Sequence, residues 1–135
     1  MRRITLSQSA KKKLREKGVQ LVFVYGSVVS GHFGPRPDLD VGIVLVPGVQ
    51  PSLDLYSELY YFFTEILPFP GKELDLVFLN QVSLPLQLEV AYEGKLLYER
   101  EKGAAFEYKE MVTRQYLDFQ HHLKKFDAVL LEAIR

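Results

Sequence analysis

Apolar residues recur along the chain with two different periods, which mark the expected strands and helices. Residues 19–25 and 39–46 are almost continuously apolar and rich in β-branched side chains, a pattern typical of strands covered on both faces. A third strand is expected at residues 73–79 and a short extended piece at residues 95–98, because turn residues bound both segments. The pattern therefore predicts a small sheet with a buried centre.

The helical period of the apolar residues predicts the remaining elements. Ser7 and Ser52 are each followed by such a segment, and serine is a preferred residue immediately before a helix. The expected helices are residues 7–17, residues 52–67, residues 84–92, a short helical turn between the first two strands, and a long helix after Gly103.

The long helix carries a single apolar stripe. No glycine or proline interrupts the chain between Gly103 and Arg135, and the apolar residues there recur at alternating steps of four and three: Val112, Tyr116, Phe119, Leu123, Phe126 and Leu130. This spacing fits three arrangements, which are packing on the chain's own sheet, pairing with a second copy, and docking on a partner protein. Packing on the chain's own sheet is the favoured interpretation.

The order of the elements is α-β-(short α)-β-α-β-α-α, which predicts a layered α/β (α+β) architecture. With 135 residues the chain has the length of one domain, so a single domain is expected over residues 1–135. Within it, residues from about 103 to 135 are expected to form a helical extension.

Composition narrows the possible functions. Lys plus Arg equals Asp plus Glu at 17 each, so no excess of positive charge indicates a polynucleotide partner. The chain has no cysteine, which leaves oxygen or histidine as the ligands for any metal. Its first residues lead into lysines and not into an apolar run, so no signal peptide is expected. No uncharged apolar stretch is long enough to cross a bilayer, so a cytoplasmic protein is expected.

Gly26 and Ser27 follow the first expected strand and are the first candidates for chemistry. A glycine there would let a phosphate approach the backbone, and Ser27 could offer its hydroxyl group. An ordinary strand-to-helix turn has the same composition, so these two residues alone are a weak signal.

Asp38 and Asp40 stand at the start of the second expected strand. Residues two apart in a strand point to the same face, so the two carboxylates would project together. Carboxylates arranged in this way suit Mg²⁺, which proteins hold with one or two carboxylates together with substrate phosphates. The alternative is a turn in which Asp38 caps the loop and Asp40 pairs with a basic side chain.

Asp75 lies within the otherwise apolar run of the third expected strand. A buried carboxylate without a partner is costly, so Asp75 is expected to be joined to a cation. Glu73 shares the strand face with Asp75 but lies nearer the polar end, and it is expected to be exposed. Three carboxylates from two neighbouring strands would match a site for two metal ions.

In combination, these residues resemble the signature of the DNA polymerase β-like nucleotidyltransferase superfamily. That signature is Gly-Ser, ten residues, Asp-x-Asp, and a third Asp on a later strand, and here it would be Gly26-Ser27, Asp38-Leu39-Asp40 and Asp75. Within the superfamily the chain resembles the minimal nucleotidyltransferases (MNT), especially the antitoxins that are paired with HEPN ribonuclease toxins. Further similarity lies in residues 73–80, 92–99 and 116–119.

The resemblance implies a fold and a set of roles. The fold would be a small mixed sheet flanked by helices, with a long C-terminal helix. Gly26 and Ser27 would hold the nucleotide phosphates, Asp38 and Asp40 would bind two Mg²⁺ ions, and Asp75 would bind the catalytic metal and help to deprotonate the attacking hydroxyl. The activity implied is transfer of AMP from ATP to a tyrosine of a HEPN toxin.

One position departs from the family pattern. Ser30 stands where the family often has an arginine before the glycine, and Arg36 is a candidate to supply the missing charge. Two alternative functions follow, namely an antitoxin that neutralises its partner by steric occlusion without catalysis, and transfer to a small molecule. A homo-oligomer is also compatible with the sequence.

Overall fold

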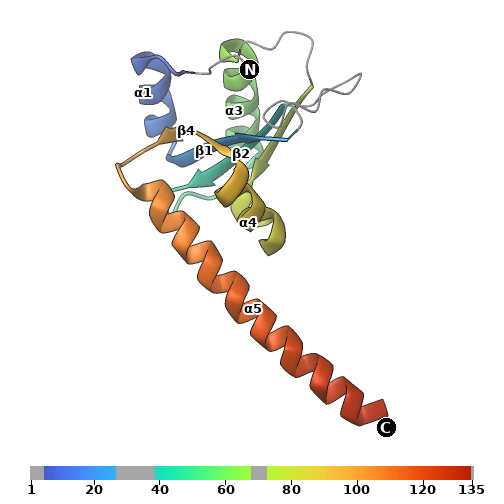
Figure 1. Ribbon diagram of the computed structural model, residues 1–135. Coiled ribbons are helices and arrows are strands. Elements are labelled where there is room, and N and C mark those ends of the chain that lie inside the picture. The colour runs from blue at the N-terminus through green and yellow to red at the C-terminus, as the bar shows by residue number, and fades with distance from the viewer. Residues whose placement is uncertain (1–4, 27–38, 68–72, 135) are drawn as a thin grey trace.

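A four-stranded sheet forms the centre of the protein, with helices on both faces. The computed structural model describes residues 5–26, 39–67 and 73–134 (Figure 1). The strands are β1 (Val19–Tyr25), β2 (Leu39–Leu45), β3 (Leu74–Phe78) and β4 (Lys95–Glu99), and their order in the sheet is β3-β2-β1-β4. The helices are α1 (Gln8–Glu16), α3 (Leu53–Ile66), α4 (Leu84–Glu93) and α5 (Ala104–Ile134), with a short 3₁₀ helix, η1, at Leu79–Gln81.

The sheet is mixed, and its two directions of pairing have different roles. Strand β1 runs antiparallel to both of its neighbours in the sheet, β2 and β4. Strand β2 runs parallel to β3, and the connection between them passes through α3, as parallel pairing requires. Because β2 and β3 are parallel, both strands begin at the same end of the sheet.

Three serines begin the shorter helices. The side-chain hydroxyls of Ser7, Ser52 and Ser83 accept hydrogen bonds from backbone amides three residues later, at 3.1, 3.1 and 3.4 Å. Each bond satisfies an amide that has no partner within the helix. The predicted starts at Ser7 and Ser52 are confirmed, whereas Ser83 is a cap that the pattern did not reveal.

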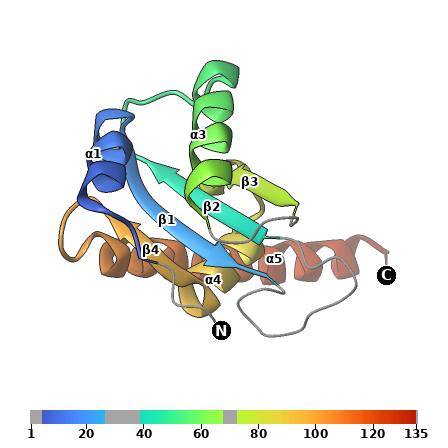
Figure 2. The same cartoon turned by 90° about the horizontal axis from the view of Figure 1, so that it is seen from above.

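Two apolar layers hold the helices on the sheet (Figure 2). Helices α1 and α3 cover one face, where Leu14, Leu59 and Phe63 pack against alternate residues of the strands. Helix α4 and the first turns of α5 cover the other face, where Val90 and Tyr108 belong to one buried cluster with Leu21 and Phe23. The prediction that the central strands are covered on both faces is confirmed.

The predicted fold class is confirmed, since the architecture is a mixed α/β layer structure with a small mixed sheet and a long C-terminal helix. Each expected strand and each of the four expected longer helices is present within two residues of its predicted bounds. The short helical turn expected between the first two strands lies outside the described residues. In the part of the chain that the structure describes, no helix is long and apolar enough to cross a membrane.

The favoured interpretation of the apolar stripe on α5 is wrong beyond its first turns. Ala104, Tyr108 and Val112 are buried, but every residue from Leu117 to Ile134 is exposed. The helix runs past the edge of the sheet and projects away from the body of the molecule (Figure 1). Regular spacing predicted the stripe, but it could not reveal that the sheet is too small to cover thirty-one residues of helix.

The exposed part of α5, residues 117–134, predicts unequal effects for substitution of Phe63 on α3 and of Phe126 on α5. Phe63 is fully buried, so Phe63→Ala should lower the free energy of unfolding by about 3–5 kcal/mol through lost burial and the cavity left behind. Phe126 is 62% exposed, so Phe126→Ala should change stability by less than about 0.5 kcal/mol in the isolated protein. Urea unfolding of both variants measures the difference, and equal losses would contradict the exposed position of the tail.

Candidate functional site

Three side chains from neighbouring strands form a row at the end of the sheet where β2 and β3 begin. Tyr25 pairs with Asp40 across β1 and β2, and Asp40 pairs with Asp75 across β2 and β3. Directly paired residues of neighbouring strands project from the same face of a sheet, with strands about 4.8 Å apart. The two carboxylates are therefore neighbours, with the Tyr25 phenol beside them on the face that α4 covers.

Gly26 leaves the space that Asp40 occupies. Its φ angle is +88°, a conformation that side chains other than glycine rarely adopt. A Cβ atom built on Gly26 would collide with the Asp40 carboxylate. Glycine at this position therefore allows both the turn that ends β1 and the close approach of a carboxylate to the backbone.

A cleft of about 560 Å³ opens between this row and α4. Tyr25, Gly26 and Asp40 line it from the sheet, and Leu86, Glu89, Val90, Glu93 and Gly94 line it from α4 and its C-terminal end. On α4 these residues follow the i, i+3, i+4, i+7 spacing of one helix face. The cleft is open to one side and is bounded by acidic and apolar groups.

The pKa of Tyr25 is shifted by burial and by the negative charges around this cleft. Burial is the main reason that the pKa of Tyr25 is raised to about 12, and the charges of Asp40, Asp75 and Glu89 raise it further. The phenol is therefore protonated at neutral pH and can act as a hydrogen-bond donor. The same three carboxylates make the cleft attractive to cations.

The structure places some of the predicted site residues and not others. It brings Gly26, Asp40 and Asp75 together at one edge of the sheet. Ser27 and Asp38 lie outside the described residues, as do Ser30 and Arg36.

The expectation that Asp75 is buried is wrong, because its side chain is exposed, and Glu73 is exposed as expected. Strand β3 is an edge strand of the sheet, so its side chains have a neighbouring strand on one side only. The expectation of a cation at Asp75 therefore rests on its pairing with Asp40 and not on burial.

The donor set fits a divalent cation. Two carboxylates that are direct cross-strand neighbours repel each other, and a cation between them removes that repulsion. Carboxylate oxygens are the ligands that Mg²⁺ prefers. Within the described ranges no group of three or more His, Cys, Asp or Glu side chains could hold a metal ion, so Asp40 and Asp75 would hold it as a pair together with groups outside those ranges.

Two residues at the site were missed by the sequence reasoning. In the sequence pattern Tyr25 is only the end of an apolar strand, but pairing of the strands places it opposite Asp40. Glu89 lies within a short predicted helix. Its spacing from Val90 and Glu93 indicates a helix face, but only the packing of α4 shows that this face turns toward the carboxylates.

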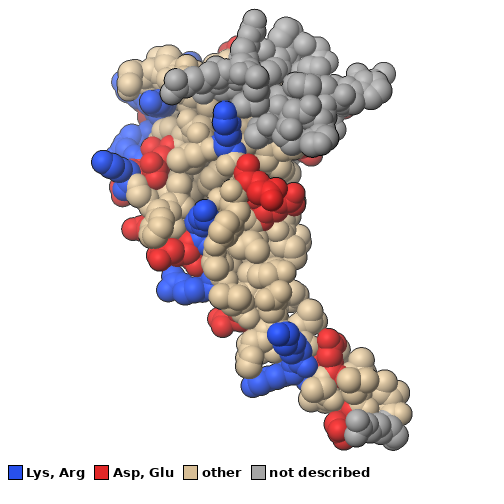
Figure 3. Space-filling view, in the orientation of Figure 1, with Lys and Arg blue, Asp and Glu red and all other residues tan. Residues whose placement is uncertain are grey.

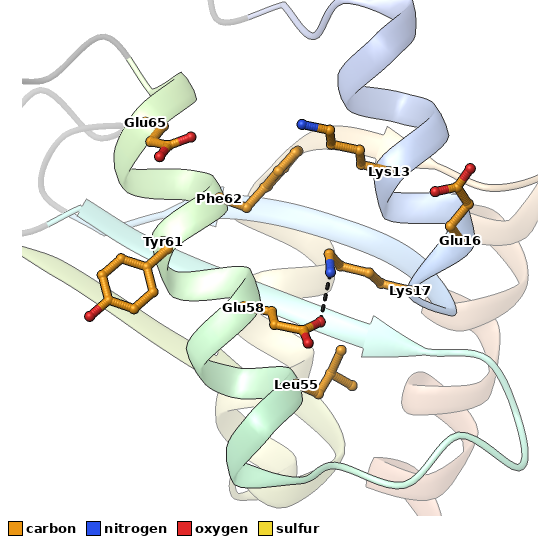
Figure 4. A pocket seen from close by; sticks show the side chains of 8 residues that line it. All are labelled: Lys13, Glu16, Lys17, Leu55, Glu58, Tyr61, Phe62 and Glu65. Carbon is orange, nitrogen blue, oxygen red and sulfur yellow. Dashed lines mark hydrogen bonds and ion pairs between the residues drawn. The ribbon is translucent and has the colours of Figure 1, made fainter.

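A second cleft, of about 730 Å³, lies between α1 and α3 on the opposite face of the sheet (Figure 4). Lys17 Nζ and Glu58 Oε2 form an ion pair of 2.7 Å across it. Phe62 forms its floor between the two helices. This cleft contains charged groups of both signs and lies on the face of the sheet opposite Asp40. It is therefore separate from the carboxylate pair.

The tyrosines of α3 serve the core and its boundary. Tyr56 packs edge-on against Phe78 with ring centres 6.2 Å apart and stacks with Tyr60 at 6.3 Å. Tyr61 is 68% exposed and lines the cleft between α1 and α3. Burial raises the pKa of Tyr56, and the nearby charge of Asp75 raises it further.

Comparison with known proteins gives a consistent set of similarities. Residues 8–103 match the family model described as polymerase beta, nucleotidyltransferase. No curated protein matches the chain. Similar folds occur in a toxin–antitoxin crystal structure with AMP-PNP, at a TM-score of 0.65 and 21% identity, with 96% of this chain and 100% of that chain covered.

A second similar structure contains a tri-AMPylated HEPN toxin of Shewanella oneidensis in complex with an MNT antitoxin. Its TM-score is 0.57 at 18% identity, and the alignment covers 96% of this chain and 100% of that chain. A third, described as the toxin–antitoxin MntA-HepT, has a TM-score of 0.55 at 18% identity with the same coverage. At these identities the likeness concerns the fold.

Alanine at Gly26 should be more harmful than alanine at another glycine with the same backbone conformation. Gly48 has a φ of +91° and open space around it, so Gly48→Ala should cost only the backbone strain of about 1 kcal/mol. Gly26→Ala carries that strain and must also displace the Asp40 side chain, so it should lose up to about 1–3 kcal/mol more, the usual cost of overpacking. Thermal or urea unfolding of the pair measures this difference, and equal losses would show that Asp40 does not pack against Gly26.

The titration of Tyr25 should respond to its carboxylate neighbours. Asp40→Asn should lower the pKa of Tyr25 from about 12, although burial keeps it above 10. Because the folded-state pKa is raised, the contribution of Tyr25 to stability is complete below pH 10 and is lost as the pH rises from 10 to about 12. NMR of ¹³C-labelled tyrosine, assigned with Tyr25→Phe, measures both values, and an unchanged pKa in Asp40→Asn would contradict the arrangement of the row.

Proposed function

The chain belongs to the polymerase beta nucleotidyltransferase family, since the family match covers more than half of its length, and from this premise we propose that it transfers AMP from ATP to a protein acceptor. The acceptor proposed is a HEPN ribonuclease toxin, for which the chain acts as the antitoxin. The observation that carries this proposal is the pairing of Asp40 with Asp75 beside Gly26 at one edge of the sheet.

The residues of the row have separate roles in the proposed reaction. Asp40 and Asp75, together with Asp38, would hold Mg²⁺, which when bound supplies positive charge that stabilises the phosphates during displacement. The backbone at Gly26 and the hydroxyl of Ser27 would bind the terminal phosphates of ATP. The raised pKa of Tyr25 keeps its phenol protonated, so it can donate a hydrogen bond at the same edge.

In the proposed transfer, an acceptor hydroxyl oxygen forms a bond to the α-phosphorus of ATP. The bond between that phosphorus and the oxygen leading to the β-phosphate breaks, and pyrophosphate leaves. Asp75 is exposed at the edge strand, so it is the carboxylate placed to receive the hydroxyl proton from an approaching acceptor. Positioning of the two reactants accounts for much of the acceleration in such a reaction.

A protein acceptor is supported by α5. Its exposed apolar side chains, Leu117, Phe119, Leu123, Phe126, Val129, Leu130, Leu131 and Ile134, are each at least 46% exposed. Apolar residues concentrated on one projecting helix are typical of a surface that binds another protein. Structures with similar folds are complexes of an antitoxin with a toxin, and in one of them the toxin is AMPylated. The proposed reaction would use cytoplasmic ATP.

The exposed tail of α5 also favours a second candidate function. An antitoxin could neutralise its partner by covering it with this helix, without any transfer. In that case the carboxylate pair would be dispensable for neutralisation, whereas the apolar side chains of the tail would be essential.

Replacement of the paired carboxylates separates the two functions. With α-labelled ATP, Mg²⁺ and the co-expressed toxin, Asp40→Asn and Asp75→Asn should each reduce label transfer to the toxin by about 100-fold or more, because the stabilisation of phosphate charge is worth several kcal/mol. Asp54→Asn, an exposed acid at the beginning of α3, is the matched control and should transfer label at the unaltered rate.

Two outcomes would contradict the transfer proposal. Label that reaches the toxin equally from the Asp40→Asn protein excludes catalysis at the carboxylate pair. Label that arrives only from γ-labelled ATP indicates transfer of a phosphoryl group. Folded variants that transfer no label yet still neutralise the toxin would favour the steric mechanism.

A further inference from the structure

Helix α4 separates two clefts, and two glutamates lie on the ridge between them. The cleft at the carboxylate row is lined by Glu89 and Glu93. A neighbouring groove of about 390 Å³, between α4 and α5, is lined by the same two residues. Glu89 and Glu93 are four residues apart, so they lie one above the other on the helix surface. A ligand that crosses this ridge contacts both clefts.

Side-chain contacts between α4 and α5 hold the two walls of this groove together. The Tyr92 hydroxyl and Thr113 Oγ1 are hydrogen-bonded at 2.8 Å across it, and Lys109 Nζ lies 4.0 Å from the centre of the Tyr92 ring. Its walls are mostly apolar or aromatic, namely Pro85, Leu88, Tyr92, Tyr116 and Leu117. Leu117 is 58% exposed and is also the first residue of the exposed tail of α5, so the groove is continuous with that tail.

The glutamates of the ridge have no cationic partner in the described part of the chain, where the ion pair present is Lys17–Glu58 on the opposite face of the sheet. Both side chains are exposed. Acidic side chains gather on this face over α4 (Figure 3). The ridge therefore presents negative charge beside a site that already contains Asp40 and Asp75.

Negative charge on the ridge is unfavourable for the nucleotide and favourable for a cationic acceptor. The triphosphate of ATP is itself anionic, so without a cation between them Glu89 and Glu93 repel it. The other reactant in the proposed function is the acceptor, which must approach the carboxylate row from outside. Charges arranged in this way select a partner of opposite sign and exclude partners of like sign.

We infer that Glu89 and Glu93 are specificity-determining residues that select an acceptor segment carrying positive charge beside its modified hydroxyl. An apolar side chain of that segment occupies the groove between α4 and α5, its cationic side chain lies on the glutamate ridge, and its hydroxyl reaches the row at Asp40. This inference rests on the proposed function for the identity of the reaction, but the recognition of charge can be measured without any transfer.

The test uses two fluorescein-labelled peptides of equal length as probes. Each contains one tyrosine and one leucine, and the tyrosine is flanked by two arginines in the first peptide and by two glutamines in the second. Fluorescence anisotropy with the full chain, Mg²⁺ and a non-hydrolysable ATP analogue should show that the arginine peptide binds about three- to tenfold more tightly, as two exposed ion pairs allow. E89Q/E93Q should bring the two affinities to within about twofold.

The matched control is E16Q/E65Q, which removes two exposed glutamates from the cleft between α1 and α3 and should keep the preference of the unaltered chain. Equal binding of the two peptides by the unaltered chain, including binding of neither, overturns the inference. Loss of the preference in E16Q/E65Q to the same extent as in E89Q/E93Q also overturns it, because net charge alone would then explain the effect.

Transfer of AMP, the proposed function, is measured separately with the same proteins and peptides. When α-labelled ATP replaces the analogue, label on the arginine peptide supports transfer at the carboxylate row. A peptide preference that depends on Glu89 and Glu93 without transfer of label to the peptide or to the toxin leaves the recognition intact and contradicts the proposed activity.

Discussion

The pairing of Asp40 with Asp75 across neighbouring parallel strands is the constraint on which the rest of the site depends. Like charges in direct cross-strand register destabilise a sheet, and this pair lies near the beginning of both strands, where solvent and a cation can reach it. The same requirement explains Gly26, since any side chain there would collide with the Asp40 carboxylate. A buried position would have made the repulsion much more costly.

The remainder of the fold holds this edge in place. The two apolar layers fix β1 and β2 from both faces, so the register that aligns Tyr25, Asp40 and Asp75 cannot slip by one residue without turning buried side chains outward. Helix α4 closes one side of the cleft and brings Glu89 to it. Helix α5 joins α4 over its first turns and then leaves the body, so one element connects the site with the exposed surface proposed to bind a partner.

The sequence revealed the elements that depend on local chemistry and failed where packing decides. Serine caps at Ser7 and Ser52 and the apolar runs of β1 and β2 predicted their elements, because capping and alternation act over a few residues. Burial of Asp75 was predicted wrongly, because the apolar run of β3 does not show that it is an edge strand. Glu89 was missed for a related reason, since the face that α4 turns toward the sheet is set by tertiary packing.

The central claim is that Asp40 and Asp75 jointly hold a divalent cation at the nucleotide. Crystals grown with Mn²⁺ and a non-hydrolysable ATP analogue test it most directly, because an anomalous difference map locates the metal independently of the protein model. We expect an anomalous peak within about 2.0–2.3 Å of carboxylate oxygens of both residues, in the range typical of hard cations. A bound nucleotide with no metal at this pair, or with the metal held elsewhere, would contradict it.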